Sequence, residues 1–289
     1  MADRFTPEQV EVLATSIAGM KQQGDEEITA LDMAKAWEAS QLSAFTAEEL
    51  QHMVKILGRS DEAVESPAKR QKTEVPPAEN RGLFIVFEGL DRSGKSTQSK
   101  LLAKHFESEG RKVKWTCFPD RSTAIGAVID LYLRKKIELS DKVIHELFSA
   151  NRWEKAPSLL ADIAQGISIV CDRYAFSGVA YSAAKGLDFE WCKTPDIGLP
   201  SPDAIFYLHV DPKVGQSRAN YGDERYENAE MQTNVRKEFQ RTELRAGVSW
   251  HDVDGDRAID TIHAEIRGKV EEAHKGKAAF APALWAAGA

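Results

Sequence analysis

Residues 83–96 read LFIVFEGLDRSGKS, an apolar run followed by a glycine-rich turn. The run Leu83–Phe87 shows no alternation of polar and apolar side chains, so we predict a strand that is buried on both faces. The turn matches the pattern G-x-x-x-x-G-K-[ST] from Gly89 to Ser96. The spacing of apolar residues after it predicts a helix over Lys95–Ser108. This succession of strand, turn and helix is the context that the pattern needs to act as a phosphate-binding loop, or P-loop.

The chemistry of such a loop follows from its residue types. Glycines let the backbone turn tightly, so that its N–H groups surround phosphate oxygens, and Lys95 adds a positive charge at the β- and γ-phosphates. Ser96 offers a hydroxyl group to Mg²⁺, and the positive end of the helix dipole points at the bound anion. We therefore expect the donor nucleotide to contact Gly89, Asp91, Arg92, Ser93, Gly94, Lys95, Ser96 and Thr97. The loop does not identify the acceptor, and the guanine motif N-K-x-D is absent from the sequence.

Four more strands are predicted further along the chain, at Val113–Phe118, Ile167–Asp172, Ala204–Val210 and Val248–Val253. Helical patterns lie between them. Strands that alternate with helices favour a parallel sheet with helices on both faces. We therefore predict an α/β fold, a doubly wound five-stranded parallel sheet of the P-loop NTPase type.

The N-terminal part of the chain has a different character. Residues 1–57 show helical spacing with two capping boxes, TPEQ at 6–9 and TAEE at 46–49, which predict helix N-termini and a small α-helical extension. Residues 58–80 are rich in Ser, Pro, Lys and Glu, a composition typical of a disordered linker. The P-loop domain is then expected over residues 81–289. The extension matches no family, and three interpretations stay open: a module that binds a protein partner, an oligomerisation arm and a non-functional extension.

The formal net charge of −7 belongs to that N-terminal part. Residues 1–80 hold 8 basic and 15 acidic residues, whereas the remainder holds 30 of each. Because contacts to nucleic-acid phosphates need Lys and Arg, we expect no direct nucleic-acid binding.

Other features of the composition concern location. No run of 18 or more apolar residues occurs, so we expect no membrane span. The three cysteines are widely spaced and form no C-x-x-C pair, which disfavours a disulfide scaffold or a zinc site and suits a reducing compartment. Acidic residues near the N-terminus argue against a mitochondrial transit peptide. We therefore expect a cytoplasmic protein.

Five segments, taken together, resemble thymidylate kinases of the eukaryotic type. They are the loop Gly89–Thr97, FPDR at 118–121, LFSANRW at 147–153, DRYAFSG at 172–178, and a lid-like segment that contains Arg218 and ERYE at 224–227. Each segment is short, but the five occur in the order and spacing of that family. The resemblance runs from about Arg81 to the C-terminus.

The resemblance implies a reaction and its partners. The γ-phosphoryl group of ATP is expected to pass to dTMP with Mg²⁺, giving dTDP for dTTP and DNA synthesis. The strand order 2-3-1-4-5 and a homodimer are also implied. The alternative within enzymes is a kinase for another nucleoside monophosphate or for a deoxynucleoside. A binding protein with a degenerate kinase fold is disfavoured by the intact set Asp91, Arg92, Lys95, Ser96, Asp172 and Arg173.

Phe148 and Arg152 are the residues expected to recognise the acceptor base. They are four residues apart, so they share one face of a helix. A phenyl ring can stack on a pyrimidine while a guanidinium group bonds its carbonyl edge, and the resemblance gives the two residues these roles toward thymine. Core packing for Phe148 and a solvated helix charge for Arg152 are the structural alternatives. We further expect Phe118, Ser177, Gly178, Tyr181 and Tyr226 to line the acceptor site, the two tyrosines near the sugar and base.

Two arginines are expected at the acceptor phosphate. Arg121 follows the second strand and Arg173 closes the third, and open α/β sheets bind ligands at these strand ends. A guanidinium fork pairs phosphate oxygens two at a time. Asp172 at the same edge suits Mg²⁺ held through water, with Ser96 as its companion. As a lone ion-paired residue Asp172 would instead be structural.

The resemblance also assigns the catalytic residues Asp91, Arg92 and Lys95. Arg92 is the arginine that stabilises the transferring phosphoryl group, because the eukaryotic type carries it in the P-loop and not in the lid. Asp91 is expected to reach the 3′-hydroxyl of dTMP, although a cap of the following helix is the alternative. Arg218 is then left to stack on adenine, beside the loop Asp254–Asp256. Catalysis of this kind is mostly positioning and positive charge.

The predicted linker contains the basic cluster Lys69-Arg70-Gln71-Lys72. Three cations in four residues resemble a short nuclear import signal in an exposed segment. A solvated charge cluster is the equally weighted alternative. The expected location is therefore cytoplasmic, with a nuclear pool if the cluster acts as a signal.

Deletion of residues 1–80 should leave the catalytic rate for dTMP phosphorylation within about twofold of the full chain, because no nucleotide-site motif lies in that segment. The measurement is kcat for the full chain and the shortened chain, with circular dichroism to check that both are folded. If the shortened chain is folded but inactive, the N-terminal helices must contribute to the active site or to a required interface.

Overall fold

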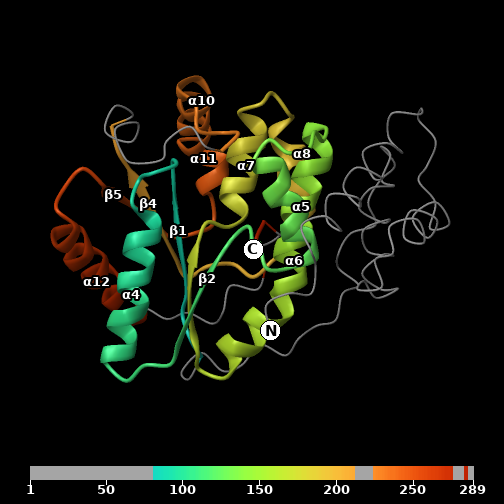
Figure 1. Ribbon diagram of the computed structural model, residues 1–289. Helices are drawn as coiled ribbons and strands as arrows, with labels where there is room; N and C mark the ends of the chain where they lie inside the picture. Colours follow the sequence, from blue (N-terminus) through green and yellow to red (C-terminus); the bar gives the residue numbers. More distant parts are fainter. Residues whose placement is uncertain (1–80, 212–223, 276–282, 286–289) are drawn as a thin grey trace.

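The computed structural model describes residues 81–211, 224–275 and 283–285. The predicted helical extension 1–57 and linker 58–80 lie outside the described residues, as do Arg218 and the basic cluster. Labels follow Figure 1. The strands are β1 Phe84–Gly89, β2 Val113–Cys117, β3 Ser168–Asp172, β4 Ala204–His209 and β5 Trp250–Asp254. The helices are α4 Lys95–Ser108, α5 Ala124–Leu133, α6 Asp141–Ala164, α7 Ala175–Ala183, α8 Phe189–Lys193, the 3₁₀ helix Thr194–Asp196, α10 Ala229–Phe239, α11 Thr242–Arg245 and α12 Ile259–Lys275.

The five strands form one sheet in the order β2-β3-β1-β4-β5, and every neighbouring pair is parallel. The predicted α/β class, strand number and strand order are thus confirmed. The bounds differ slightly from those predicted. β2 ends before Phe118 because Pro119 has no N–H to continue the ladder, and β5 begins at Trp250 because Gly247, at φ 77°, still belongs to the preceding turn.

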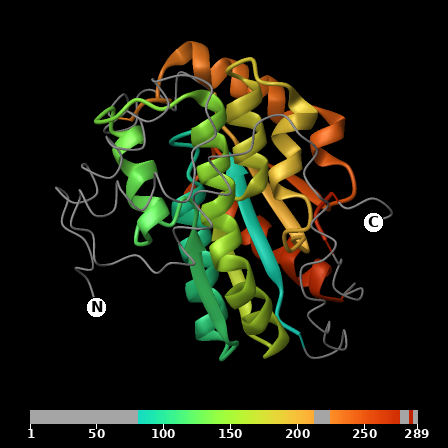
Figure 2. The same cartoon turned by 90° about the vertical axis from the view of Figure 1, so that its right-hand side faces the viewer.

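Helices cover both faces of the sheet. Figure 1 shows α4 and α12 on one face and the larger group α5, α6, α7, α8, α10 and α11 on the other. In Figure 2 the long helix α6 lies across the strands on that second face. Each face has its own hydrophobic core, as expected for a three-layer doubly wound domain.

The central strand β1 explains the continuous apolar run of the sequence. Phe84 and Val86 point into the core beneath α6 and α7, whereas Leu83, Ile85 and Phe87 point into the core beneath α4 and α12. All five are at most 1% exposed. A strand with helices on both sides has no face exposed to water, which accounts for the continuous apolar run Leu83–Phe87.

The carboxyl ends of the parallel strands meet at one edge of the sheet. The glycine-rich loop follows β1, Phe118–Arg121 follows β2, and Arg173 follows β3. The candidate segments are thereby brought together although they lie far apart in the chain. For example, the Arg173 N–H donates to the Phe87 carbonyl at 2.9 Å, across 85 intervening residues. Within the described residues, no helix is long and apolar enough to cross a membrane.

The loop after β2 is held in place by a very close backbone contact. Gly126 lies in the first turn of α5, where the Thr123 hydroxyl accepts its N–H. A Cβ atom at Gly126 would lie 1.8 Å from the Asp120 carbonyl oxygen. The Asn151 side chain also bonds this loop, accepting from the Asp120 N–H at 2.7 Å.

Gly126→Ala should destabilise the protein by about 2–3 kcal/mol or more. The added methyl group would clash with the backbone at Asp120, which cannot move aside as a flexible side chain can. Gly268→Ala in α12 is the matched control. No atom lies within 4 Å of a Cβ built there, so it should stabilise by about 0.5–1 kcal/mol through helix propensity. Urea unfolding of the two variants measures both effects. Equal stabilities would contradict the close approach at Gly126.

Candidate active site

The glycine-rich loop depends on a left-handed backbone and on close packing. Gly89 has φ 142° and Gly94 has φ 99°. A Cβ at Gly89 would lie 2.3 Å from the Leu208 carbonyl oxygen, so only glycine fits between β1 and β4. Arg92 also adopts a positive φ, 62°. That conformation is uncommon for an arginine, and such strain concentrates at functional sites.

Lys95 is buried at the start of α4, and its hydrogen-bond acceptors among the described residues are neutral oxygens. Its ammonium group donates to the Leu90 carbonyl and, at 3.3 Å, to the Ser93 hydroxyl. Burial and, next, the nearby charge of Arg173 lower the pKa of Lys95 to about 8, although the neighbouring carboxylates act in the opposite direction. A phosphate group at this position would supply the negative charge that Lys95 lacks there.

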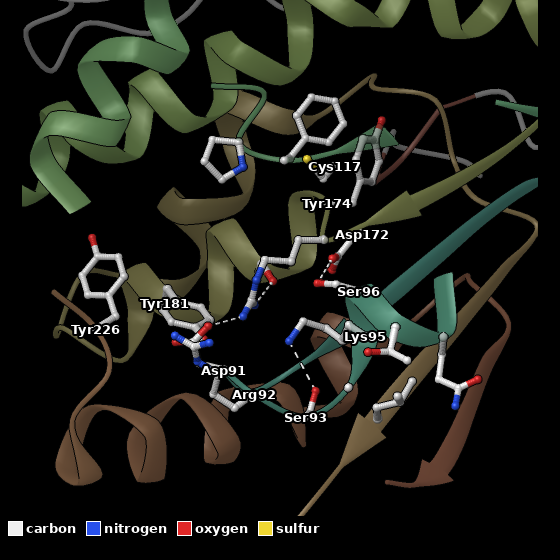
Figure 3. A pocket seen from close by; sticks show the side chains of 18 of the residues that line it. Asp91, Arg92, Ser93, Lys95, Ser96, Cys117, Asp172, Tyr174, Tyr181 and Tyr226 are labelled. Atoms are coloured by element: carbon white, nitrogen blue, oxygen red, sulfur yellow. Dashed lines mark hydrogen bonds and ion pairs between the residues drawn. The ribbon is translucent and has the colours of Figure 1, made fainter. Parts of the chain in front are cut away.

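Ser96 and Asp172 meet beside Lys95, on the opposite side of the loop from Asp91, Tyr181 and Tyr226 (Figure 3). The Ser96 hydroxyl donates to Oδ2 of Asp172. Oδ1 of Asp172 is buried and has no hydrogen-bond partner among the described residues. A hydroxyl beside a carboxylate with an unused oxygen fits Mg²⁺, which proteins bind through one or two carboxylates together with substrate phosphates.

Asp91 is the centre of a second network. Its carboxylate pairs with Arg173 and accepts hydrogen bonds from the Tyr181 hydroxyl (3.0 Å) and the Gln232 amide (2.7 Å). Gln232 also accepts from the Asp91 N–H at 3.0 Å. Burial would raise the pKa of Asp91, but the charges of Arg173 and Lys95 outweigh it and lower the pKa below the usual value. Asp91 is therefore an anion aimed into the site, and it does not cap α4, whose N-cap Gly94 has no side-chain bond.

Arg92 reaches away from the sheet toward the segment after residue 223. Its Nε donates to Oε1 of Glu227 at 2.9 Å, and Glu227 is almost fully buried. Arg92 itself keeps about a third of its side chain exposed to solvent. Arg92 is therefore paired with a carboxylate and at the same time lines the cavity.

At the far end of the site, Phe148 and Arg152 lie on one face of α6, as predicted. Phe148 packs against the core but also lines the cavity. Arg152 is only 2% exposed and pairs through two bonds with Asp196, Nε–Oδ1 at 3.0 Å and Nη2–Oδ2 at 2.6 Å. A Cβ at Gly178 would lie 2.8 Å from Nη2 of Arg152. Arg152 is therefore a buried, oriented group and not a solvated helix charge.

Arg121 and the two tyrosines are further parts of the wall of the site. Arg121 pairs with Asp130 at 2.5 Å and with Glu224 at 2.6 Å and is 37% exposed. The rings of Tyr181 and Tyr226 lie 5.5 Å apart. Burial raises the pKa of Tyr181 well above its usual value, so its hydroxyl stays protonated and donates to Asp91.

These groups line one continuous cavity of about 780 Å³. The predicted site residues found in its wall are Asp91, Arg92, Ser93, Gly94, Lys95, Ser96, Thr97, Phe118, Arg121, Phe148, Arg152, Asp172, Arg173, Ser177, Gly178, Tyr181 and Tyr226. Gly89 supports the loop from below, and Arg218 lies outside the described residues. Gly255, Arg257, Ile259 and Ile262 form the end opposite Phe148. Arg225 points away, paired with Glu138.

Several residues of this site were not predicted from the sequence. Gln232, Glu227 and Asp196 each hold a predicted residue in place, but an ordinary polar residue on a helix or turn gives no signal of its partner. Glu88 is also buried beneath the loop, where burial raises its pKa against the hydrogen bond from Ser177 and the charge of Arg173. Its position directly before Gly89 is the only available hint.

A parallel sheet with a P-loop between the two ends of one cavity defines a P-loop phosphotransferase. A model of the family "Thymidylate kinase" matches residues 87–266. The chain belongs to the thymidylate kinase family.

Individual relatives agree with the family match. The chain is 50% identical over 191 residues to the thymidylate kinase of Schizosaccharomyces pombe, covering 65% of this chain and 91% of that protein. It is 42% identical over 197 residues to that of Homo sapiens, covering 68% and 93%. The solved structure of thymidylate kinase from Candida albicans is similar with a TM-score of 0.61 and 37% identity, covering 67% of this chain and 94% of that one.

The affinity for ATP should fall as the pH rises above about 8. The nucleotide-free Lys95 loses its proton there, whereas bound phosphates favour the charged form, so binding must take up a proton and weakens by up to about tenfold per pH unit. Calorimetry with a non-hydrolysable ATP analogue between about pH 7 and pH 9.5 measures the slope. Lys95→Arg is the control and should remove the slope, because arginine stays charged. A flat profile in the unchanged protein would contradict this.

Proposed function

We propose that this protein transfers the γ-phosphoryl group of ATP to dTMP, giving dTDP. The observation that carries the proposal is the cavity whose wall contains Lys95 of the P-loop, the Phe148 and Arg152 pair, and Arg173. A donor triphosphate at the loop and a pyrimidine at the far end would bring their phosphates together beside Arg173. Membership of the thymidylate kinase family supports the same reaction.

Recognition of thymine rests on the oriented guanidinium group of Arg152. Asp196 takes up Nε and one terminal nitrogen of Arg152, so the remaining donors face the cavity. A thymine carbonyl can accept these hydrogen bonds, whereas the amino group of cytosine offers another donor and would leave both groups unpaired. The Phe148 ring supplies the stacking surface. Phe118, Ser177, Gly178 and Tyr226 enclose the acceptor.

The phosphoryl transfer itself needs positive charge at the equatorial oxygens and correct alignment. Lys95 holds the β- and γ-phosphates, and Arg92 exchanges Glu227 for the transferring group. Arg121 and Arg173 hold the acceptor phosphate, which attacks as an anion without a strong base. Asp91 accepts the 3′-hydroxyl of the sugar. Ser96 and Asp172 would hold Mg²⁺, which when bound neutralises charge on the donor phosphates.

Further expectations from the sequence stay proposals. Arg218 is proposed to stack on the adenine of ATP, at the end of the cavity formed by Gly255, Arg257, Ile259 and Ile262. The division into a helical extension, a linker and a kinase domain is likewise proposed, with a homodimer as the assembly and a protein partner for the extension. We also propose a cytoplasmic location with a nuclear pool through Lys69-Arg70-Gln71-Lys72.

With Mg-ATP, the purified protein should phosphorylate dTMP with a kcat/KM at least about a hundredfold above those for dCMP and AMP, the scale expected when buried donors are left unpaired. A coupled assay of ADP release measures all three, together with dUMP and thymidine. A Lys95→Met variant controls for contaminating kinases. Comparable rates on all acceptors would reject thymidylate specificity, and a preference for another monophosphate or for thymidine would establish the alternative kinase.

A further inference from the structure

Glu88 is a buried carboxyl group that the mechanism above does not use. It is 0% exposed, lies at the end of β1 and does not line the cavity. Its three hydrogen bonds to described residues go to Tyr174, in the turn between β3 and α7, and to Ser177, in the first turn of α7. Oε1 accepts from the N–H groups of Tyr174 (2.9 Å) and Ser177 (3.1 Å), and Oε2 bonds the Ser177 hydroxyl.

The first of these contacts serves the N-terminus of α7. This helix begins at Ala175, and its N-cap Tyr174 makes no side-chain capping bond. The first N–H groups of a helix have no partner within the helix and must find one elsewhere. Glu88 supplies that acceptor from a different element, so the capping group of α7 comes from the central strand.

The second contact leads to Arg173. The Ser177 hydroxyl donates to Glu88, so its lone pairs stay available and it accepts from Nη1 of Arg173 at 3.0 Å. Nη1 also donates to the Gly89 carbonyl at 3.0 Å, and Nη2 pairs with Asp91. Glu88 thus orients the Ser177 hydroxyl, which in turn orients the guanidinium group of Arg173.

The backbone of Arg173 needs such support. Its φ is +66°, a left-handed conformation that costs about 1–3 kcal/mol for a residue other than glycine and persists only where the surroundings enforce it. Glu88 binds the N–H of the next residue and that of Ser177, one turn further on. Glu88 therefore fixes the left-handed turn through the residues that follow Arg173.

We propose that Glu88 is a positioning residue for the acceptor phosphate. It fixes the left-handed turn at Arg173 and aims the guanidinium group through Ser177, without touching either substrate. The inference rests on the proposed role of Arg173 at that phosphate. It adds a buried residue to the acceptor side of the reaction, although Glu88 belongs in sequence to the donor loop.

Glu88→Gln tests the proposal, because glutamine keeps the shape and one oxygen for the two N–H groups but presents an NH₂ group to Ser177. We expect KM for dTMP to rise about tenfold, about 1.4 kcal/mol, with KM for ATP changed less than twofold. Asp203→Asn is the matched control. Asp203 likewise accepts a backbone N–H and an arginine, those of Phe84 and Arg81, but at the amino end of the sheet. It should lower stability and leave both KM values unchanged.

The contribution through Arg173 is isolated by a double-mutant cycle. In an Arg173→Ala background, Glu88→Gln should raise the acceptor KM by less than about twofold further, because coupled residues are not additive. Additive effects, equal changes in both KM values, or an unchanged KM for dTMP would each overturn the proposal. If Glu88→Gln does not fold, Glu88→Asp replaces it, because one methylene fewer withdraws the carboxyl group from Ser177; the same selective rise is expected, and an unchanged KM for dTMP would overturn the idea.

The outcome is separable from that of the proposed function. If the unchanged protein does not phosphorylate dTMP, the proposed function fails at that step. The same cycle can then be run with whichever monophosphate is accepted, because Arg173 is assigned to the phosphate and not to the base. If Glu88→Gln changed the KM values for ATP and for the monophosphate equally in that second series, the role of Glu88 would be overturned independently of the proposed function.

Discussion

The parallel pairing of β1 with β3 is the interaction on which the rest of the site depends. In this register Phe87 lies opposite Asp172, so the glycine-rich loop leaves one strand where Asp172 and Arg173 leave the next. The pairing of Gly89 with Leu208 fixes the loop from the other side. A shift of one residue would turn the side chains of β1 to the wrong cores and separate Ser96 from Asp172. The burial of β1 on both faces makes such a shift costly.

The cationic side chains of the site are already paired or hydrogen-bonded within the protein. Arg92, Arg121, Arg152 and Arg173 each pair with a carboxylate, whereas Lys95 bonds a carbonyl and a hydroxyl. Burying a charge is costly unless the charge is paired. The carboxylate partners offset this cost, so the folded protein holds the arginines in place before substrate arrives. In the proposed mechanism, the substrate phosphates would compete with these carboxylates for Arg92, Arg121 and Arg173, which are already oriented. Arg152 differs from the other three arginines, because a fully buried partner on a neighbouring turn leaves it no freedom to move.

Much of this arrangement could be predicted from the sequence, because its signals are local. Leu83–Phe87 and the glycine pattern specify a buried strand and a P-loop, and the helix over Lys95–Ser108 has the predicted bounds. The residues lining the cavity were found because they belong to short segments that resemble those of the family, at strand ends for Asp172 and Arg173 and on a helix for Phe148 and Arg152. Gln232, Glu227, Asp196 and Glu88 were missed because their roles arise only when elements far apart in the chain are packed together. Gln232 is 141 residues from Asp91, and no periodicity or motif connects the two.

The close approach of Arg152 to Gly178 has a consequence for how this site can change in evolution. The guanidinium group fills the space that any side chain at position 178 would need, and Asp196 prevents it from swinging aside. The three positions therefore constrain one another: a larger residue at 178 requires a shorter one at 152, which would leave the carboxylate at 196 buried with the Ser149 hydroxyl but without its charged partner. Single changes at any of the three are disfavoured, so a lineage that acquires a different acceptor base would have to pass through a combined substitution.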